Sequence, residues 1–116
     1  MKNIDAVLAI RKEIINKSNL DFEVILKLIE LKRYYFGLQY VTTSNNAICK
    51  ALEIPVEAGT RYKAELESNN HLVGSVDKFT CPYTGENVQF LSASLEEFDR
   101  LIKLSTNQLN LFEDGK

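Results

Sequence analysis

Histidine and cysteine are scarce in this sequence of 116 residues, which has one histidine, two cysteines and no tryptophan. His71 stands alone, and Cys49 and Cys81 lie 32 positions apart, so neither a zinc-ligand spacing nor a disulfide framework is present. We therefore predict no metal and no cofactor. The two cysteines are expected to be free thiols, buried or half-buried, in a reducing cytoplasm.

Long apolar runs and known catalytic motifs are also absent. A membrane span needs about twenty consecutive apolar residues, and no run in the sequence approaches that length. The segment Met1–Asp5 has neither the basic patch nor the apolar core of a secretory signal. No Gly-rich loop precedes a lysine, and neither GxSxG nor HExxH occurs. These absences predict a protein that is not an enzyme, is not exported and does not enter a membrane.

The composition that is present indicates one globular domain. Apolar residues make up 45% of the chain and charged residues 26%, with 14 basic against 16 acidic side chains. A chain of this length buries roughly two thirds of the surface that it exposes when unfolded, so it can fold without a disulfide or a metal.

Apolar residues recur with helical spacing in five segments. The spacing predicts helices over residues 4–17, 22–36, 45–53, 56–68 and 95–104. The second segment is apolar around most of its circumference, which favours a central place in the core, and we expect Gly37 to end it. Pro55 ends the third helix because proline lacks an N–H and clashes with the preceding turn.

Residues 72–91 have the composition of a β-hairpin. β-branched and aromatic residues flank the segment Cys81–Asn87, which contains the proline, glycine and asparagine of a tight connection. The fold class predicted from these elements is mainly α with a small β-hairpin, that is, α+β. Residues 1–104 form the domain, and residues 105–116, which lack periodicity, form a flexible tail.

The segment from Thr43 to Pro55, followed by Tyr62, Leu66 and Leu72, resembles the helix-turn-helix of bacterial and phage winged-helix proteins. The resemblance covers about residues 20 to 92 and leaves extra helices at both ends. It implies that Val56 to Ser68 is the recognition helix and Lys78 to Asn87 the wing. The implied partner is DNA, and the implied contacts are Thr60, Arg61, Lys63 and Lys78.

The charge of this region is weak for a DNA-binding surface. Residues 41–77 contain three basic and five acidic side chains, a net charge of 3 − 5 = −2, whereas residues 1–20 contain four basic and two acidic side chains, a net charge of +2. DNA-binding domains usually present a basic face to the phosphates. A winged helix used for protein contacts or for dimerisation therefore stays open as an alternative.

The pentapeptide Gln108-Leu109-Asn110-Leu111-Phe112 resembles the motif Q-L-[S/D]-L-F, which attaches bacterial replication and repair proteins to the β sliding clamp. The resemblance implies that Leu111 and Phe112 are apolar anchors, that Gln108 supplies amide hydrogen bonds and that Leu109 makes a further apolar contact. Asn110 departs from the motif but is still small and polar. The alternative is that these apolar residues fold back over the domain or add an edge strand.

Together these patterns predict a winged-helix protein that associates with DNA and is linked to the replication machinery by its tail, in the manner of phage or mobile-element accessory factors. Two alternatives remain. One is a transcription regulator, a homodimer formed through the first and last helices. The other is a protein that contacts only proteins, as a competitor or inhibitor at the clamp.

Overall fold

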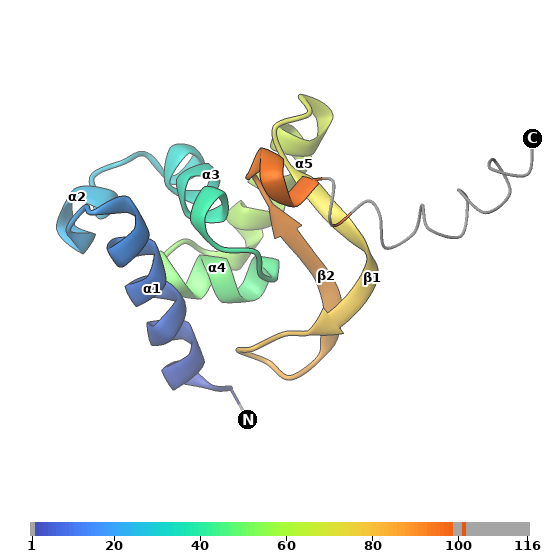
Figure 1. Ribbon diagram of the computed structural model, residues 1–116, viewed down its shortest axis with the longest axis horizontal. Coiled ribbons are helices and arrows are strands. Elements are labelled where there is room, and N and C mark those ends of the chain that lie inside the picture. The colour runs from blue at the N-terminus through green and yellow to red at the C-terminus, as the bar shows by residue number, and fades with distance from the viewer. Residues whose placement is uncertain (1, 99–100, 102–116) are drawn as a thin grey trace, which may run out of the picture.

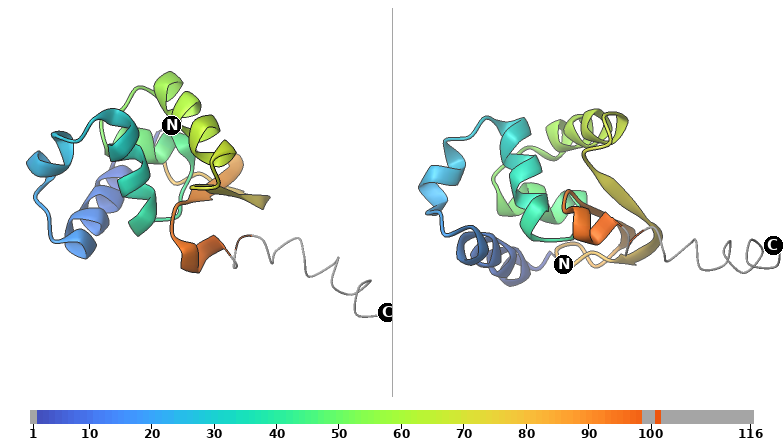
Figure 2. Two further views of the ribbon diagram at one scale, coloured as in Figure 1. Left: turned by 90° about the horizontal axis from the view of Figure 1, so that it is seen from above. Right: turned by 45° about the horizontal axis from the view of Figure 1, so that its top comes forward.

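The computed structural model describes residues 2–98 and residue 101. Its elements are α1 (Ile4–Ser18), α2 (Phe22–Leu26), α3 (Glu30–Tyr40), α4 (Asn45–Ala51), α5 (Val56–Ser68), β1 (Val73–Thr80) and β2 (Asn87–Ser92). The helices α1 and α2 lie at one end and the two strands at the other, with α3 and α4 between them (Figure 1, Figure 2). The protein is thus mainly α with a small antiparallel β-hairpin, laid out like a winged helix-turn-helix domain.

Most predicted helices are confirmed. α1 and α5 match the helices predicted over 4–17 and 56–68, and α4 matches the one predicted over 45–53 but ends at Ala51. Side-chain caps fix the starts of α1 and α4: Asn3 accepts the Ala6 N–H at 3.1 Å, and Ser44 accepts the Ala47 N–H at 3.1 Å. Residues 95–98 and 101 of the last predicted helix are helical. The predicted boundary at residue 104 lies outside the described residues.

The single helix predicted over residues 22–36 is wrong. The chain leaves the helix after Leu26 and begins a new one at Glu30, with Ile29 in extended conformation. Gly37 does not end α3 but lies inside it, where a Cβ atom would come within 2.5 Å of the Leu52 side chain. The glycine therefore serves close packing of α3 on α4, and α3 continues to Tyr40.

Arg33 explains the break between α2 and α3. Its guanidinium donates to the carbonyl oxygens of Leu26 at 2.9 Å and Leu28 at 3.1 Å, which the break leaves without helical partners. The same group donates to the carbonyl oxygens of Leu52 at 3.1 Å and Glu53 at 3.4 Å, just beyond α4. One side chain thus holds two helix ends together, a role that needs the several fixed donors of arginine.

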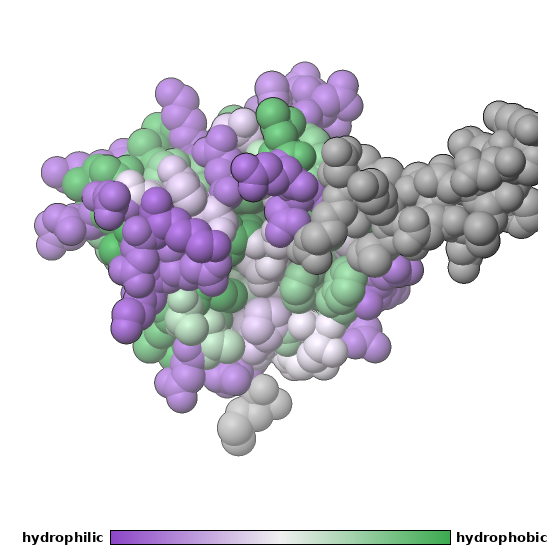
Figure 3. Space-filling view, in the orientation of Figure 1, coloured by the Kyte–Doolittle hydropathy of each residue, from purple (hydrophilic) through white to green (hydrophobic). Residues whose placement is uncertain are grey.

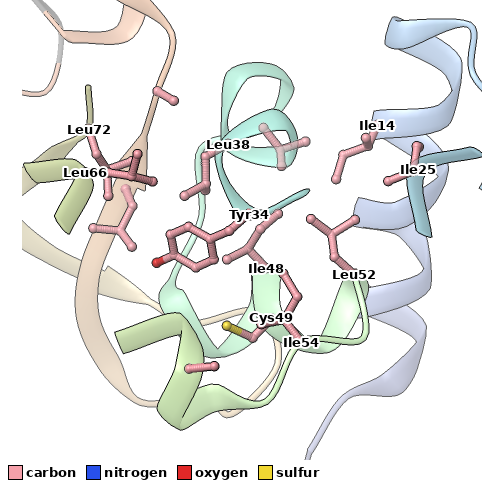
Figure 4. Close-up of a cluster of buried hydrophobic side chains, with 14 residues drawn as sticks. Ile14, Ile25, Tyr34, Leu38, Ile48, Cys49, Leu52, Ile54, Leu66 and Leu72 are labelled. Atoms are coloured by element: carbon pink, nitrogen blue, oxygen red, sulfur yellow. The ribbon is translucent and has the colours of Figure 1, made fainter. Parts of the chain in front are cut away.

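The main core lies around α3 and α4. Figure 4 shows Tyr34 and Ile48 in its middle, with Ile14 of α1 on one side and Leu66 of α5 on the other. Tyr34, Ile14 and Ile48 are each 0% exposed. Apolar side chains from all five helices meet in this cluster, so burial of apolar surface fixes the arrangement of the helices.

A short strand segment joins the helices to the hairpin. Thr43, between α3 and α4, exchanges two backbone hydrogen bonds with Leu91 of β2, at 3.2 and 2.7 Å. The sheet has two strands, and this isolated bridge, which the sequence did not reveal, adds one paired residue beside β2. This bridge places the hairpin beside the pair α4 and α5, as in a winged helix.

The tip of the hairpin packs on α1 and α4. Tyr83 accepts the Asn3 N–H at 2.7 Å, and the Cys81 thiol lies 2.9 Å from the Ser44 hydroxyl. Both Cys81 and Tyr83 are buried with Val7 and two alanines of α4 in a second apolar cluster. Figure 1 shows the tip reaching toward the start of α1. The prediction of buried free cysteines is confirmed, since Cys49 and Cys81 are both free and buried.

An irregularity interrupts the pairing of the strands. Gly74 pairs with Leu91 and Lys78 with Gln89, so three residues of β1 stand opposite one residue of β2. The hydroxyl of Ser75 accepts the Phe90 N–H at 3.0 Å and so replaces the missing backbone acceptor. This β-bulge leaves Val76 60% exposed.

Replacing Arg33 with methionine is expected to lower the free energy of unfolding by about 2–4 kcal/mol, because the part-buried carbonyls of two helix ends lose their donor. The measurement is urea denaturation followed by circular dichroism. Arg61→Met, at an exposed position, is the control and should change stability by less than about 0.5 kcal/mol. Equal losses in the two variants would contradict this role of Arg33.

Candidate nucleic-acid interface

The solvent face of α5 carries two of the predicted DNA contacts. Thr60 and Arg61 are both exposed. The Thr60 hydroxyl donates to the Val56 carbonyl at 3.1 Å, so this side chain lies along its own helix. Glu57 and Glu65, one turn before and after Arg61, are exposed as well. The outer face of α5 is therefore slightly acidic.

Lys63 points to a different side of α5. Its ammonium forms an ion pair with Glu67 at 3.0 Å, and the two side chains are about one third exposed. Lys63 also lines a groove with Asn45 and Asn46 of α4 and Gln89 of β2. This lysine faces the hairpin, and a carboxylate already offsets its charge.

Lys78 comes from another element than the three α5 residues. It is exposed on β1 and pairs across the hairpin with Gln89 of β2. It stands at the end of the β-bulge, above the buried tip of the hairpin. The four predicted DNA contacts thus occupy three surfaces: the outer face of α5, the side of α5 toward the hairpin, and β1.

The buried tip creates a polar groove that the sequence analysis did not predict. We call it the α4–hairpin groove; it has a volume of about 660 Å³ and is lined by Lys2, Asn46, Lys50, Ile54, Pro55, Val56, Tyr83, Thr84 and Glu86. The smaller groove that contains Lys63, of about 180 Å³, shares Asn46 with it. The two together follow the junction between the helix pair and the hairpin.

The two lysines that line the α4–hairpin groove have no carboxylate partner among the described residues. Lys50 is exposed, and neither it nor Lys2 takes part in an ion pair between described residues. The Lys2 ammonium lies 5.6 Å from the centre of the Tyr83 ring, over its face. Glu86 is the one acidic residue among those that line the groove. The groove therefore has a net positive charge at neutral pH.

This groove could hardly be predicted from the sequence, because its walls are distant along the chain. Lys2 precedes α1, Lys50 belongs to α4 and Thr84 to the hairpin tip. The one usable signal was Tyr83, a large aromatic residue in a predicted tight turn. A buried aromatic tip implies a surface that receives it, although not which surface.

A part-buried polar network connects α3, α4 and α5. The Tyr34 hydroxyl donates to the Asn45 side-chain oxygen at 2.7 Å, and the Asn45 amide donates to the Thr60 hydroxyl at 3.4 Å. The Cys49 thiol donates to the same Asn45 oxygen at 3.7 Å. Gly59 allows this approach, since a Cβ there would lie 2.2 Å from the Cys49 sulfur. Asn45 thus connects the core to the face of α5.

Burial controls the titration of this network. Loss of hydration raises the pKa of Cys49 to about 12, and the charge of Glu30 contributes in the same direction. Burial also raises the pKa of Tyr34 far above its ordinary value, as do the charges of Cys49 and Glu67. Both groups are therefore neutral donors at physiological pH, which is the state that their bonds to Asn45 require.

Comparison with family models, with curated proteins and with solved structures finds no match to this chain. The described residues contain no group of three or more histidine, cysteine or acidic side chains arranged to hold a metal ion. In the part of the chain that the structure describes, no helix is both long and apolar enough to cross a bilayer. The clamp-binding candidates Gln108, Leu109, Leu111 and Phe112 lie outside the described residues.

The raised pKa of Cys49 predicts a loss of stability in alkali. The folded thiol binds its proton more tightly than the unfolded one, so the free energy of unfolding falls between the ordinary thiol pKa of about 8.5 and the folded value of about 12. Between pH 9 and 11 it should fall by about 2 kcal/mol more in the native protein than in Cys49→Ser, whose hydroxyl does not titrate there.

Urea denaturation under reducing conditions, at pH 7, 9, 10 and 11, measures this difference. The two proteins are compared by how steeply the free energy of unfolding falls with pH, because the serine variant also loses packing energy at every pH. Parallel curves for the two proteins would show that Cys49 is not protonated more tightly in the fold.

Proposed function

We propose that this chain is a cytoplasmic, non-enzymatic winged-helix protein that associates with DNA and is tethered to the bacterial β sliding clamp by Gln108–Phe112, as a replication or repair accessory factor. The observation that carries the proposal is the pentapeptide itself, with four of its five residues matching the clamp motif. It follows the helical segment that begins at Leu95.

The chemistry of the pentapeptide supports docking in a preformed apolar pocket. In linear motifs of this kind a few anchors supply most of the affinity, and Leu111 and Phe112 are the two large adjacent apolar residues. A peptide that binds in this way is ordered on binding, so its affinity is moderate and depends on each anchor.

The fold supports the DNA half of the proposal. The bridge between Thr43 and Leu91 gives the helix pair and hairpin the layout of a winged helix. In that layout the second helix of the pair, here α5, faces the partner, and Thr60 and Arg61 are exposed on it. The folded part also presents the positive α4–hairpin groove.

Two weak contacts can together give stable association. When the clamp holds the tail, the folded domain is kept near DNA at an effective concentration that reaches the millimolar range for a short flexible linker. The domain then needs little affinity of its own. A formal charge of −2 is compatible with such a protein, whereas it is unusual for a protein that must find DNA alone.

A protein that contacts only proteins, as a clamp competitor, is the second candidate. The observation that favours it is the acidic character of the outer face of α5, where Glu57 and Glu65 flank Arg61. A dimeric transcription regulator is less well supported. Its best evidence is Ile4 and Leu8, one helical turn apart on α1 and each 47% exposed.

The clamp contact predicts that Leu111→Ala/Phe112→Ala weakens binding to purified bacterial clamp by at least about 30-fold, because two anchor side chains are removed. Isothermal titration calorimetry measures the affinity. Leu95→Ala is the matched control, since Leu95 is a leucine 78% exposed outside the motif, and it should bind like the native protein. Equal affinity of native protein and double variant, or binding by neither, would refute the tether.

The DNA contact predicts weak, salt-dependent binding to duplex DNA by the folded domain. If two or three phosphates are contacted, raising monovalent salt from 50 to 200 mM lowers the affinity by about 10- to 40-fold. Fluorescence anisotropy with labelled duplex and single-stranded oligonucleotides measures it. Tight binding to one palindromic site would instead support the regulator, and absence of binding at 50 mM salt would leave the protein-only candidate.

A further inference from the structure

We propose that the phosphates of a DNA duplex lie in the α4–hairpin groove, contacted by Lys2 and Lys50, and not against the outer face of α5. The inference rests on the DNA association proposed above and names the surface that performs it. It differs from the sequence-based expectation, in which α5 supplies three contacts and Lys78 the fourth.

The α4–hairpin groove has positive charge that is available to a phosphate. Lys2 and Lys50 line one groove and are not engaged by any carboxylate among the described residues. The neighbouring cations each face a carboxylate. Lys63 pairs with Glu67 at 3.0 Å, and the Arg11 guanidinium lies 3.8 Å from the Glu53 carboxylate.

The outer face of α5, the alternative surface, would repel phosphates. The outer face of α5 presents one cation, Arg61, between the exposed carboxylates of Glu57 and Glu65. Glu57 and Glu65 are four residues before and after Arg61, one helical turn away, so a phosphate brought to Arg61 also comes near two carboxylates, and like charges at short distance oppose each other even in water. In the α4–hairpin groove the balance is reversed, with two lysines against Glu86.

The groove is preformed by contacts within the protein. Its hairpin wall is held by the hydrogen bond from Asn3 to the Tyr83 carbonyl at 2.7 Å and by the contact between Ser44 and Cys81 at 2.9 Å. Lys2 is positioned over the Tyr83 ring by the same packing. Binding therefore orders few groups, which lowers its entropic cost.

The lining of the groove also suits a sugar-phosphate backbone. The Asn46 side chain lies beside the two ammonium groups as a neutral donor and acceptor, and the Thr84 hydroxyl, which accepts the Glu86 N–H at 3.2 Å, still has its O–H to donate. Asn46 stands where the groove meets the smaller one that contains Lys63 and Gln89. A DNA strand whose phosphates contact Lys2 and Lys50 could therefore continue along the two grooves toward α5. On that path it would meet the side-chain amides of Asn46 and Gln89.

The test compares neutralised lysines in the intact chain. Lys2→Gln/Lys50→Gln should bind a labelled 20-base-pair duplex at least tenfold more weakly at 50 mM salt. The slope of log affinity against log salt should become less steep by about 1.8, which corresponds to two lost phosphate contacts. The control is Lys12→Gln/Lys27→Gln, which has the same net charge as the first variant but changes two exposed positions outside the groove. Its affinity for the duplex should fall by less than twofold.

Arg61→Gln tests the competing surface and is expected to change affinity by less than twofold. If Arg61→Gln removes most of the binding while the Lys2/Lys50 variant keeps the native affinity and salt slope, the groove is refuted although DNA association stands. Equal losses in the two lysine pairs would show only a general charge effect and would also refute it. Binding restricted to single strands, or no binding by the native chain, overturns the inference, and only the last result removes the proposed DNA association too.

Discussion

The packing of the hairpin tip on α1 and α4 is the contact on which the candidate interface depends. Tyr83 and Cys81 are buried there, and the N-terminal segment is held against Tyr83 by a backbone hydrogen bond. If the tip projected freely, Lys2 would have no wall beside it and Lys50 would stand alone on α4. One apolar contact therefore decides whether scattered lysines form a groove.

The local features of the fold were predictable because each leaves a mark in the sequence. Helical spacing located α1, α4 and α5, and the turn residues between β1 and β2 located the hairpin. The break between α2 and α3 was not predictable. It depends on Arg33, whose donors reach carbonyls near residues 26–28 and 52–53, and an exposed arginine would give the same sequence pattern. Hydrogen bonds between residues distant in the chain leave no periodic pattern in the sequence, so they cannot be predicted from it.

In the candidate site, too, some features could be predicted from the sequence and others could not. The sequence identified the exposed residues of α5, because exposure follows from helical position. It did not identify Lys2 or Lys50, since their proximity results from the tip folding back over α1. Nor did it show that Asn45 connects Tyr34 in the core with Thr60 on α5. That connection links α3, α4 and α5 through side-chain hydrogen bonds.

The β-bulge has a consequence for how copies of this chain meet. Among the described residues β1 pairs only with β2, which leaves its other edge without a strand. A regular edge of this kind invites a strand from another molecule, and that is a common origin of aggregation. The irregular stretch from Ser75 to Asp77 disturbs the regular alternation of donors and acceptors along the edge. Strand addition at this edge is thereby disfavoured.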